Sequence, residues 1–336
     1  MGGPYDACMI MQASSAEAPG IGFVVPMHGE DSLVLETLES LRQQSVRPAS
    51  VVVVVDGVVS DEESIRSHPI VDRLEVLGTT SGGPATPRNR GFTIIQDDCD
   101  AVCFLDHDDL LHPEFVRTAQ AALIKEPEAD LIAFRFRVWH SDTPLVGLSS
   151  PPESPSLEPV GLDDYLACTG SILPSFSVLR NRIASTIRES GTFFDANYPS
   201  NQDFDAFVRI LSSYSGVCCS WESGWYRVHP ASISANAAHA WACRAKACND
   251  LTNYFKARGD ASYMRGFRRA RATAVRRSAR HLWVEGQRGE AIRRLGGEAL
   301  RRLDIRALSL LLLLGSGLDR KVRMMSSGDP RARRDF

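Results

Sequence analysis

Short apolar runs alternate with amphipathic stretches along the first two thirds of the chain. Residues 50–56 read SVVVVVD, and a run of β-branched residues without alternation is typical of a strand buried on both faces of a parallel sheet. Between the runs, apolar residues recur at near-helical spacing. The pattern predicts strands at residues 21–26, 50–56, 74–77, 101–105, 131–139 and 217–227, and helices at residues 31–44, 84–96, 113–125, 162–167 and 202–211, with a further helix from residue 181. Strands that alternate with helices predict an α/β fold with a mainly parallel central sheet flanked by helices.

The remaining stretches divide the chain into three parts. Residues 1–20 have no basic n-region and no sustained apolar stretch, so we expect a flexible N-terminal tail, neither a secretory signal nor a membrane anchor. Residues 21–234 form the expected α/β domain, and a loop rich in Ser and Pro at residues 141–159 joins its two halves. After residue 234 the pattern is helical nearly throughout, which predicts a helical C-terminal extension over residues 235–336.

Composition and charge add a second division. The chain is 43% hydrophobic and 24% charged, as expected of a globular protein with a sizeable core. Its eight cysteines have no zinc-site spacing, so we expect buried, reduced thiols in a cytosolic protein. The net charge of -3 conceals an asymmetry, because residues 265–336 carry 19 Lys and Arg against 7 Asp and Glu, a net of +12, and the remainder carries -15. An acidic body with a basic tail indicates two parts with different partners.

Acidic side chains follow several of the predicted strands. Asp56 follows the valine run, and Asp106, Asp108 and Asp109 follow the apolar residues 101–105. Ligands of open α/β sheets bind outside the carboxyl ends of the strands, and hard carboxylate oxygens in a D-x-D arrangement suit Mg²⁺ or Mn²⁺. A lone D-x-D is also common in solvated loops and at helix starts, so this motif alone does not decide between a metal site and a polar loop.

Six motifs, taken in order, carry a resemblance to a known family. They are FVVPMHGE (residues 23–30), VVVVVDGVVSD (51–61), GGPATPRNRGF (82–92), FLDHDDLLHPEF (104–115), NQDFDAFVRI (201–210) and WYRVHPASIS (225–234). Each is similar to an element of the family 2 glycosyltransferases, which have the GT-A fold, a Rossmann-like, mainly parallel sheet flanked by helices. The resemblance spans residues 21–234 and implies a metal-dependent inverting enzyme that takes a nucleotide-sugar, expected to be UDP-linked.

The resemblance also implies roles for individual residues in donor binding. It places Pro26 in the nucleotide loop, Asp56 at the uracil or ribose, and Arg88 at the pyrophosphate, whereas Arg90 is equally well explained as a helix-surface residue. Asp106 and Asp108 are expected to hold the nucleotide and a Mn²⁺ or Mg²⁺ ion, with Asp108 the direct ligand, and Asp109 to cap the following turn. His229 is expected either to complete the metal shell or to be structural, and Arg227 either to contact phosphate or to brace its strand.

The general base is assigned in the same way. Asp203 corresponds to the family's catalytic carboxylate, and Asp205 is the alternative. Two positions depart from the family pattern, because Gly57 stands where the family has a second acid after Asp56, and Gln202 stands where it has a Glu before the base. These departures leave a second interpretation open, a catalytically degenerate binding or scaffold module. A sugar nucleotidyltransferase is a third, but residues 25–31 lack its Gly-rich triphosphate loop.

The tail supports two interpretations. Arginine-rich helices followed by the apolar residues 308–314 fit peripheral attachment to anionic lipid, since that run is far shorter than the roughly 20 residues that span a bilayer. The same charges fit a helical cap on the acidic body. Nucleic acid is not an expected partner, because stacking aromatics are sparse there. We expect a cytoplasmic enzyme, peripheral at the inner face of the cell membrane, that acts on a bacterial surface glycan or its lipid-linked precursor.

Overall fold

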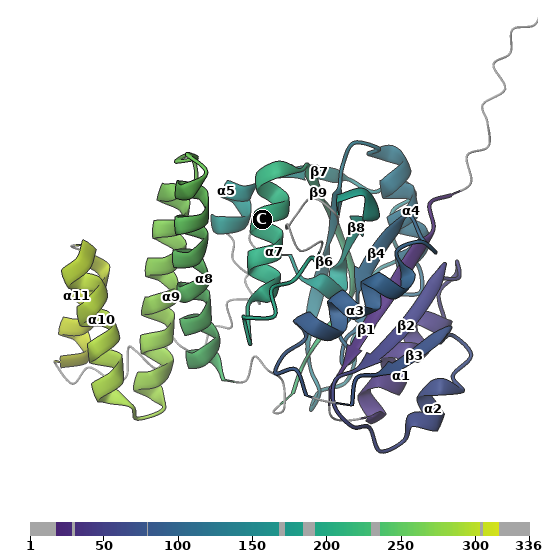
Figure 1. Ribbon diagram of the computed structural model, residues 1–336, viewed down its shortest axis with the longest axis horizontal. Helices are drawn as coiled ribbons and strands as arrows, with labels where there is room; N and C mark the ends of the chain where they lie inside the picture. The colour runs from purple at the N-terminus through teal and green to yellow at the C-terminus, as the bar shows by residue number, and fades with distance from the viewer. Residues whose placement is uncertain are drawn as a thin grey trace, which may run out of the picture.

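A nine-stranded mixed sheet forms the centre of the molecule (Figure 1). The computed structural model describes residues 18–28, 31–78, 80–167, 172–183, 192–229, 236–302 and 305–315; the expected N-terminal tail therefore lies mostly outside the described residues. The strand order is β3-β2-β1-β4-β8-β6-β9-β5, and β7 pairs with β9. The strands are β1 (Ile21–Met27), β2 (Ser50–Val55), β3 (Arg73–Val76), β4 (Ala101–Phe104), β5 (Leu110–Leu111), β6 (Leu131–His140), β7 (Leu157–Val160), β8 (Ser177–Arg180) and β9 (Gly216–Val228).

Strands β1 to β4 are mutually parallel, and β8 runs antiparallel between β4 and β6. Strand β9 is parallel to β6, while β5 and β7 pair with β9 in the antiparallel direction. The prediction of a mainly parallel sheet flanked by helices is therefore confirmed. Because β1, β2 and β4 point the same way, the residues that follow them meet at one edge of the sheet.

The valine run of β2 shows why the sheet is buried on both faces. Successive side chains of a strand point to opposite faces, so Val52 and Val54 join one core cluster and Val51, Val53 and Val55 join the other. Val51, Val53 and Val55 pack on one face with residues of α1 (Asp31–Arg42) and α4 (Phe115–Lys125). Val52 and Val54 pack on the other face with residues of α3 (Ala85–Ile95), α5 (Leu162–Ala167) and α7 (Gln202–Ser213). A short helix, α2 (Glu62–Arg66), precedes β3.

The structure differs from the sequence prediction at four elements, one of which is β8, where no strand was predicted. The predicted loop at residues 141–159 ends in an unpredicted edge strand, β7, and the two-residue strand β5 was also missed. The helix expected from residue 181 is a single 3-10 turn, Asn181–Ile183, and residues 184–191 lie outside the described part of the chain. A second 3-10 turn, Pro174–Phe176, leads into β8.

Within the described residues, four helices follow the sheet and confirm the predicted helical C-terminal region: α8 (Ala237–Ala257), α9 (Met264–Val284), α10 (Arg288–Arg302) and α11 (Ile305–Gly315). In Figure 1 they extend to one side of the sheet, with α8 and α9 beside α5 and α7, and with α10 and α11 outermost. Cys248, Leu251 and Phe267 of α8 and α9 belong to the same core cluster as the sheet residues Val52 and Val54. Whether residue 234 separates two domains stays a prediction. Among the described helices, none is long and apolar enough to cross a membrane.

Candidate active site

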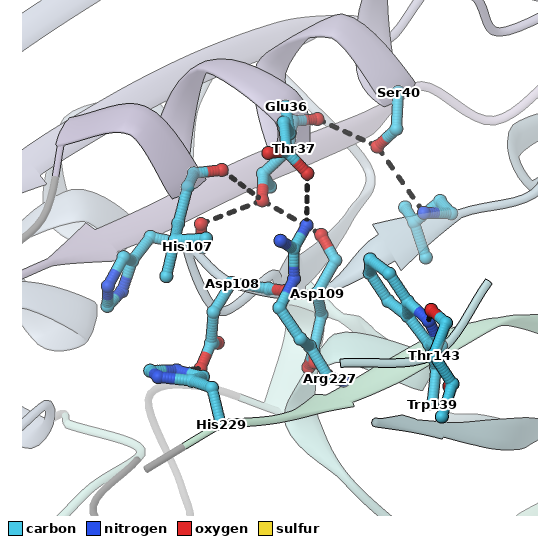
Figure 2. Close-up of polar contacts among 12 residues, drawn as sticks. Glu36, Thr37, Ser40, His107, Asp108, Asp109, Trp139, Thr143, Arg227 and His229 are labelled. Carbon is cyan, nitrogen blue, oxygen red and sulfur yellow. Dashed lines mark hydrogen bonds and ion pairs between the residues drawn. The ribbon is translucent and has the colours of Figure 1, made fainter. Parts of the chain in front are cut away.

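Three aspartates lie in the loop between β4 and β5, residues 106–109, here named the acid loop. Asp106 forms an ion pair with Arg88 of α3. The Oδ2 atom of Asp108 lies 3.0 Å from Nε2 of His229, which directly follows β9 (Figure 2). Asp109 is buried and accepts hydrogen bonds from the Ser175 hydroxyl at 2.6 Å and from the Arg227 backbone N–H at 2.9 Å. Each carboxylate thus has a different partner, and the sheet brings His229 to Asp108.

The expected role of Asp109 as a turn cap was wrong. Its side chain joins the acid loop to β9 and to the 3-10 turn before β8. The backbone N–H of Asp106 donates to the Ser175 hydroxyl at 3.1 Å, so one serine contacts both ends of the loop. Burial raises the pKa of Asp109 well above its usual range, and the charges of Asp108 and Asp106 add to this effect. Asp109 is therefore an internal anchor of the site.

Arg227 braces its strand, one of its two expected roles. Its Nε donates to the Asp108 carbonyl at 2.7 Å, its Nη2 lies 2.6 Å from Oε2 of Glu36 on α1, and its guanidinium lies over the Trp139 ring at 4.6 Å (Figure 2). Only 4% of the residue is exposed. These contacts hold β6, β9, α1 and the acid loop together. A contact of Arg227 with the donor phosphates stays a prediction.

Helix α1 supplies a further clamp that sequence reasoning missed. The Thr37 hydroxyl lies 2.8 Å from the His107 carbonyl and 2.9 Å from the Asp109 carbonyl, so it can donate to either (Figure 2). Ser40 accepts a hydrogen bond from the Leu111 backbone N–H at 3.3 Å. The sequence signal for this contact was the position of Thr37 on the apolar side of an amphipathic helix. A hydroxyl buried there requires a hydrogen-bond partner, and Thr37 is fully buried.

The residues expected to contact the nucleoside lie at the ends of β1 and β2. Pro26 is a buried residue of β1, paired in register with Val54. Asp56 is 3% exposed, and its Oδ1 accepts a hydrogen bond from the Ser81 backbone N–H at 2.7 Å. The backbone at Gly57 has a φ of +105°, where a side chain is strained, so the acid that this position lacks would not fit the loop as it is built. Nucleoside contacts of Pro26 and Asp56 stay predictions.

The two arginines of α3 have different surroundings. Arg88 is 3% exposed, lies 5.1 Å from the Phe194 ring centroid and pairs with Asp106. The Nε atom of Arg90 instead lies 2.5 Å from Glu75 at the surface, as the helix-surface interpretation of Arg90 requires. Arg88 thus offsets negative charge in the acid loop. For Asp106, burial raises the pKa, and the charge of Arg88 opposes this shift.

Asp203 lies in the first turn of α7 and is partly exposed, with its Oδ1 accepting a hydrogen bond from the Phe204 backbone N–H at 2.9 Å. The alternative base, Asp205, is fully buried, and both of its oxygens lie 3.1 Å from Nε of Arg209. Gln202 is buried too. A Cβ atom added to Gly83, just before α3, would lie 3.2 Å from the Pro199 carbonyl, so the residues leading into α7 pack beside the start of α3. Of the two aspartates, Asp203 is the better placed to meet a substrate.

A divalent cation fits the donor set at Asp108 and His229. Mg²⁺ is usually held by one or two carboxylates together with substrate phosphates and water, and carboxylate and water oxygens also suit Mn²⁺. The carboxylate of Asp108 and the ring of His229 already converge, whereas Asp106 is engaged by Arg88. Within the described part of the chain, no group of three or more His, Cys, Asp or Glu residues forms a complete metal site. A cation held here would therefore depend on the donor phosphates.

Comparisons with known proteins give the same family. The model of glycosyl transferase family 2 matches residues 23–182. The amylovoran biosynthesis glycosyltransferase AmsB of Erwinia amylovora is 28% identical over 197 residues, which cover 55% of this chain and 62% of AmsB. The match therefore spans less than two thirds of that relative.

Solved structures show the same fold. The S. aureus TarS 1-349 structure in complex with UDP has a TM-score of 0.56 at 18% identity and covers 91% of this chain and 88% of TarS 1-349. Its complex with UDP-GlcNAc has a TM-score of 0.55 at 15% identity, covering 84% and 92%. At such identities the likeness concerns the fold alone. With the family match, these findings identify residues 23–182 as similar to glycosyl transferase family 2, on a fold shared with TarS.

Proposed function

We propose that this protein is an inverting glycosyltransferase that moves a sugar from a UDP-sugar to an acceptor hydroxyl. The family match, the convergence of Asp108 and His229, and the UDP and UDP-GlcNAc complexes of TarS support this proposal. The observation that carries it is the contrast in α7 between the buried, ion-paired Asp205 and the partly exposed Asp203, which pairs with no basic side chain among the described residues.

Donor binding is assigned to the carboxyl edge of the sheet. Asp56 faces the nucleoside, and Arg88, already beside Asp106, offsets the charge of the diphosphate. Asp108 and His229 would hold a Mn²⁺ or Mg²⁺ ion, which when bound would supply Lewis-acid stabilisation of the diphosphate charge. Arg227 and Thr37 keep the acid loop in place.

Transfer requires a base for the acceptor. Asp203 takes the proton of the acceptor hydroxyl while the hydroxyl oxygen attacks the anomeric carbon. The bond from that carbon to the diphosphate oxygen breaks, and the diphosphate leaves with the electron pair. Attack on the face opposite the leaving group inverts the anomeric configuration.

The acceptor and the location belong to the proposal as well. A bacterial surface glycan or its lipid-linked precursor is the proposed acceptor, supported by the name of AmsB, which is an amylovoran biosynthesis glycosyltransferase. Exposed side chains on the last three helices support peripheral contact with the inner face of the membrane from the cytoplasm. The exposed arginines of α9 and α10 are Arg265, Arg268, Arg269, Arg288 and Arg293, and the exposed apolar residues of α10 and α11 are Ile292 and Leu308.

Replacing Asp203 with Asn tests the function directly. The change keeps size and shape but removes basicity, so transfer from a UDP-sugar should fall by roughly 10²–10⁴-fold while UDP affinity is unchanged. The measurement is the rate of UDP release in the presence of acceptor, alongside calorimetric UDP binding.

Asp205→Asn is the matched control. It weakens a buried pair with Arg209 and should lower the melting temperature more than the rate of transfer. Near-normal transfer by the Asp203 variant, with loss of transfer in a folded Asp205 variant, would show that the base is assigned two residues too early.

A further inference from the structure

Helix α8 reaches back to the residues that begin α7. Asn201 directly precedes α7, and its side-chain Nδ2 donates to the Ala240 carbonyl of α8 at 2.8 Å. Its Oδ1 accepts a hydrogen bond from Arg244 Nε at 2.6 Å. Nearby, the Tyr198 hydroxyl donates to Asp250 of α8 at 2.8 Å. The segment that leads to Asp203 is therefore tied to α8 at several points.

The conformation of Asn201 indicates that this tie serves more than helix stability. Its φ is 66°, and among the described residues it is the one non-glycine residue with positive φ. An Asn before a helix ordinarily caps it by accepting from a backbone N–H of the first turn. Here the side chain makes no such cap, because its amide is bound to α8. Asn adopts this left-handed conformation more readily than other non-glycine residues, and here the conformation accompanies a side chain that binds α8 and not the helix it precedes.

Arg244 holds the residues on both sides of Asp203. It bonds Asn201, and its guanidinium lies 3.9 Å from the centroid of the Phe204 ring. Arg244 is 8% exposed, and its Nη1 is a buried atom without a hydrogen-bond partner among the described residues. The buried Oε1 of Gln202 also lacks a partner within the described part of the chain. Two unsatisfied polar atoms where α8 meets the start of α7 are unfavourable for stability, so packing alone does not explain this contact.

We propose that Arg244 is a positioning residue, which acts through Asn201 and Phe204 to fix the first turn of α7 and thereby the direction of the Asp203 carboxylate. The proposal rests on the proposed function of Asp203 as base. It makes α8, which lies beyond the residues matched by the family model, a part of the acceptor side of the active site. General base catalysis depends on geometry, so a small change in this turn reduces turnover even when the donor binds normally.

Arg244→Met and Asn201→Gly test the proposal with steady-state kinetics of the full-length protein. The glycine variant keeps the positive φ and loses the amide, so it should fold even if the Met variant does not. Each variant should lower kcat by about tenfold or more with the donor KM within about twofold of wild type. The double variant should lose less than the product of the two single losses, because both changes break the hydrogen bond between Arg244 and Asn201. Arg258→Met, at the exposed end of α8, is the matched control and should leave kcat unchanged.

The outcomes separate this proposal from the proposed function. If Asp203→Asn abolishes transfer but Asn201→Gly leaves kcat unchanged, the positioning role is overturned and the function stands. A loss of kcat in the double variant equal to the product of the two single losses would also overturn it. So would single variants whose kcat/KM falls only because the donor KM rises. If Asp203→Asn transfers normally, or wild type transfers from none of a panel of nucleotide-sugars, the function fails and this role fails with it.

Discussion

Three aspartates of one short loop illustrate how strongly surroundings differ between neighbouring residues. Asp106 faces Arg88, Asp108 faces His229, and Asp109 is enclosed between Ser175 and Arg227. None of these partners is a neighbour in sequence, and only the sheet brings them together. The D-x-D pattern could therefore indicate a ligand site at this loop but not the role of each carboxylate, as the mistaken turn cap at Asp109 shows.

A metal-dependent donor site predicts a specific effect of Asp108. If Asp108 and His229 share a cation with the diphosphate, UDP should bind more tightly with Mn²⁺ than with EDTA, and Asp108→Ala should remove most of that gain. Isothermal titration calorimetry with and without Mn²⁺ measures both affinities.

His107→Ala serves as the control on the same loop, because the His107 side chain is not among the proposed ligands, and it should keep the Mn²⁺ effect. Equal UDP binding with and without Mn²⁺, unaffected by Asp108→Ala, would exclude the proposed cation at this position.

At the scale of elements, the sequence predicted the buried strands and long helices well, because their periodicity is strong. Five consecutive valines define β2, and the apolar spacing of residues 31–44 defines α1. The strands that it missed include β5, which is too short to have a period, and β7, an edge strand that contains Pro159. Both pair with β9, the strand that carries Arg227 to the acid loop. The docking of the loop onto β9 could not be predicted, because it depends on contacts between residues far apart in the chain.

The exposed arginines of α9 lead to a prediction for membrane contact. Phe267 and Ala270 of α9 lie in the main core, so deleting this helix would damage the fold and cannot test the idea cleanly. Arg268→Glu combined with Arg269→Glu changes exposed side chains only. Sedimentation with vesicles rich in anionic lipid, at low salt, should show at least a several-fold loss of binding, since each basic residue near such a surface contributes about 1 kcal/mol.

The charge-matched control is Arg47→Glu with Arg66→Glu, two exposed arginines elsewhere in the chain, which should leave vesicle binding intact. If the full-length protein does not bind such vesicles at low salt, the helices serve as a cap and the membrane contact is rejected.

At the scale of the whole molecule, the acidic and basic parts of the chain are not simply joined end to end. Helices α8 and α9 share a core cluster with the sheet, while α10 and α11 pack on a second cluster with Leu282 and Trp283 of α9. Within α9 and α10, Arg271 is buried and pairs with Glu298. Part of the basic charge therefore lies inside the helical region, and the remainder stays exposed for a partner.

Integration of α8 into the core can be measured by the reactivity of its two cysteines. Cys248 is fully buried, and burial raises the pKa of its thiol to about 12, whereas Cys243, one turn earlier, is partly exposed. Thiolate is the reactive form, so at about pH 8 Cys248 has roughly a thousandfold less of it than a thiol of ordinary pKa, besides being enclosed. Quantitative maleimide labelling followed by mass spectrometry should modify Cys243 first and Cys248 only on global unfolding.

The internal reference is Cys103 of β4, whose thiol is equally enclosed and has its pKa raised by burial. If α8 is part of the folded core, Cys248 and Cys103 should label at the same rate, because both require the same unfolding event. Labelling of Cys248 at the rate of Cys243 while Cys103 stays protected would mean that α8 opens independently of the sheet, and it would also contradict a role for Arg244 in holding the base.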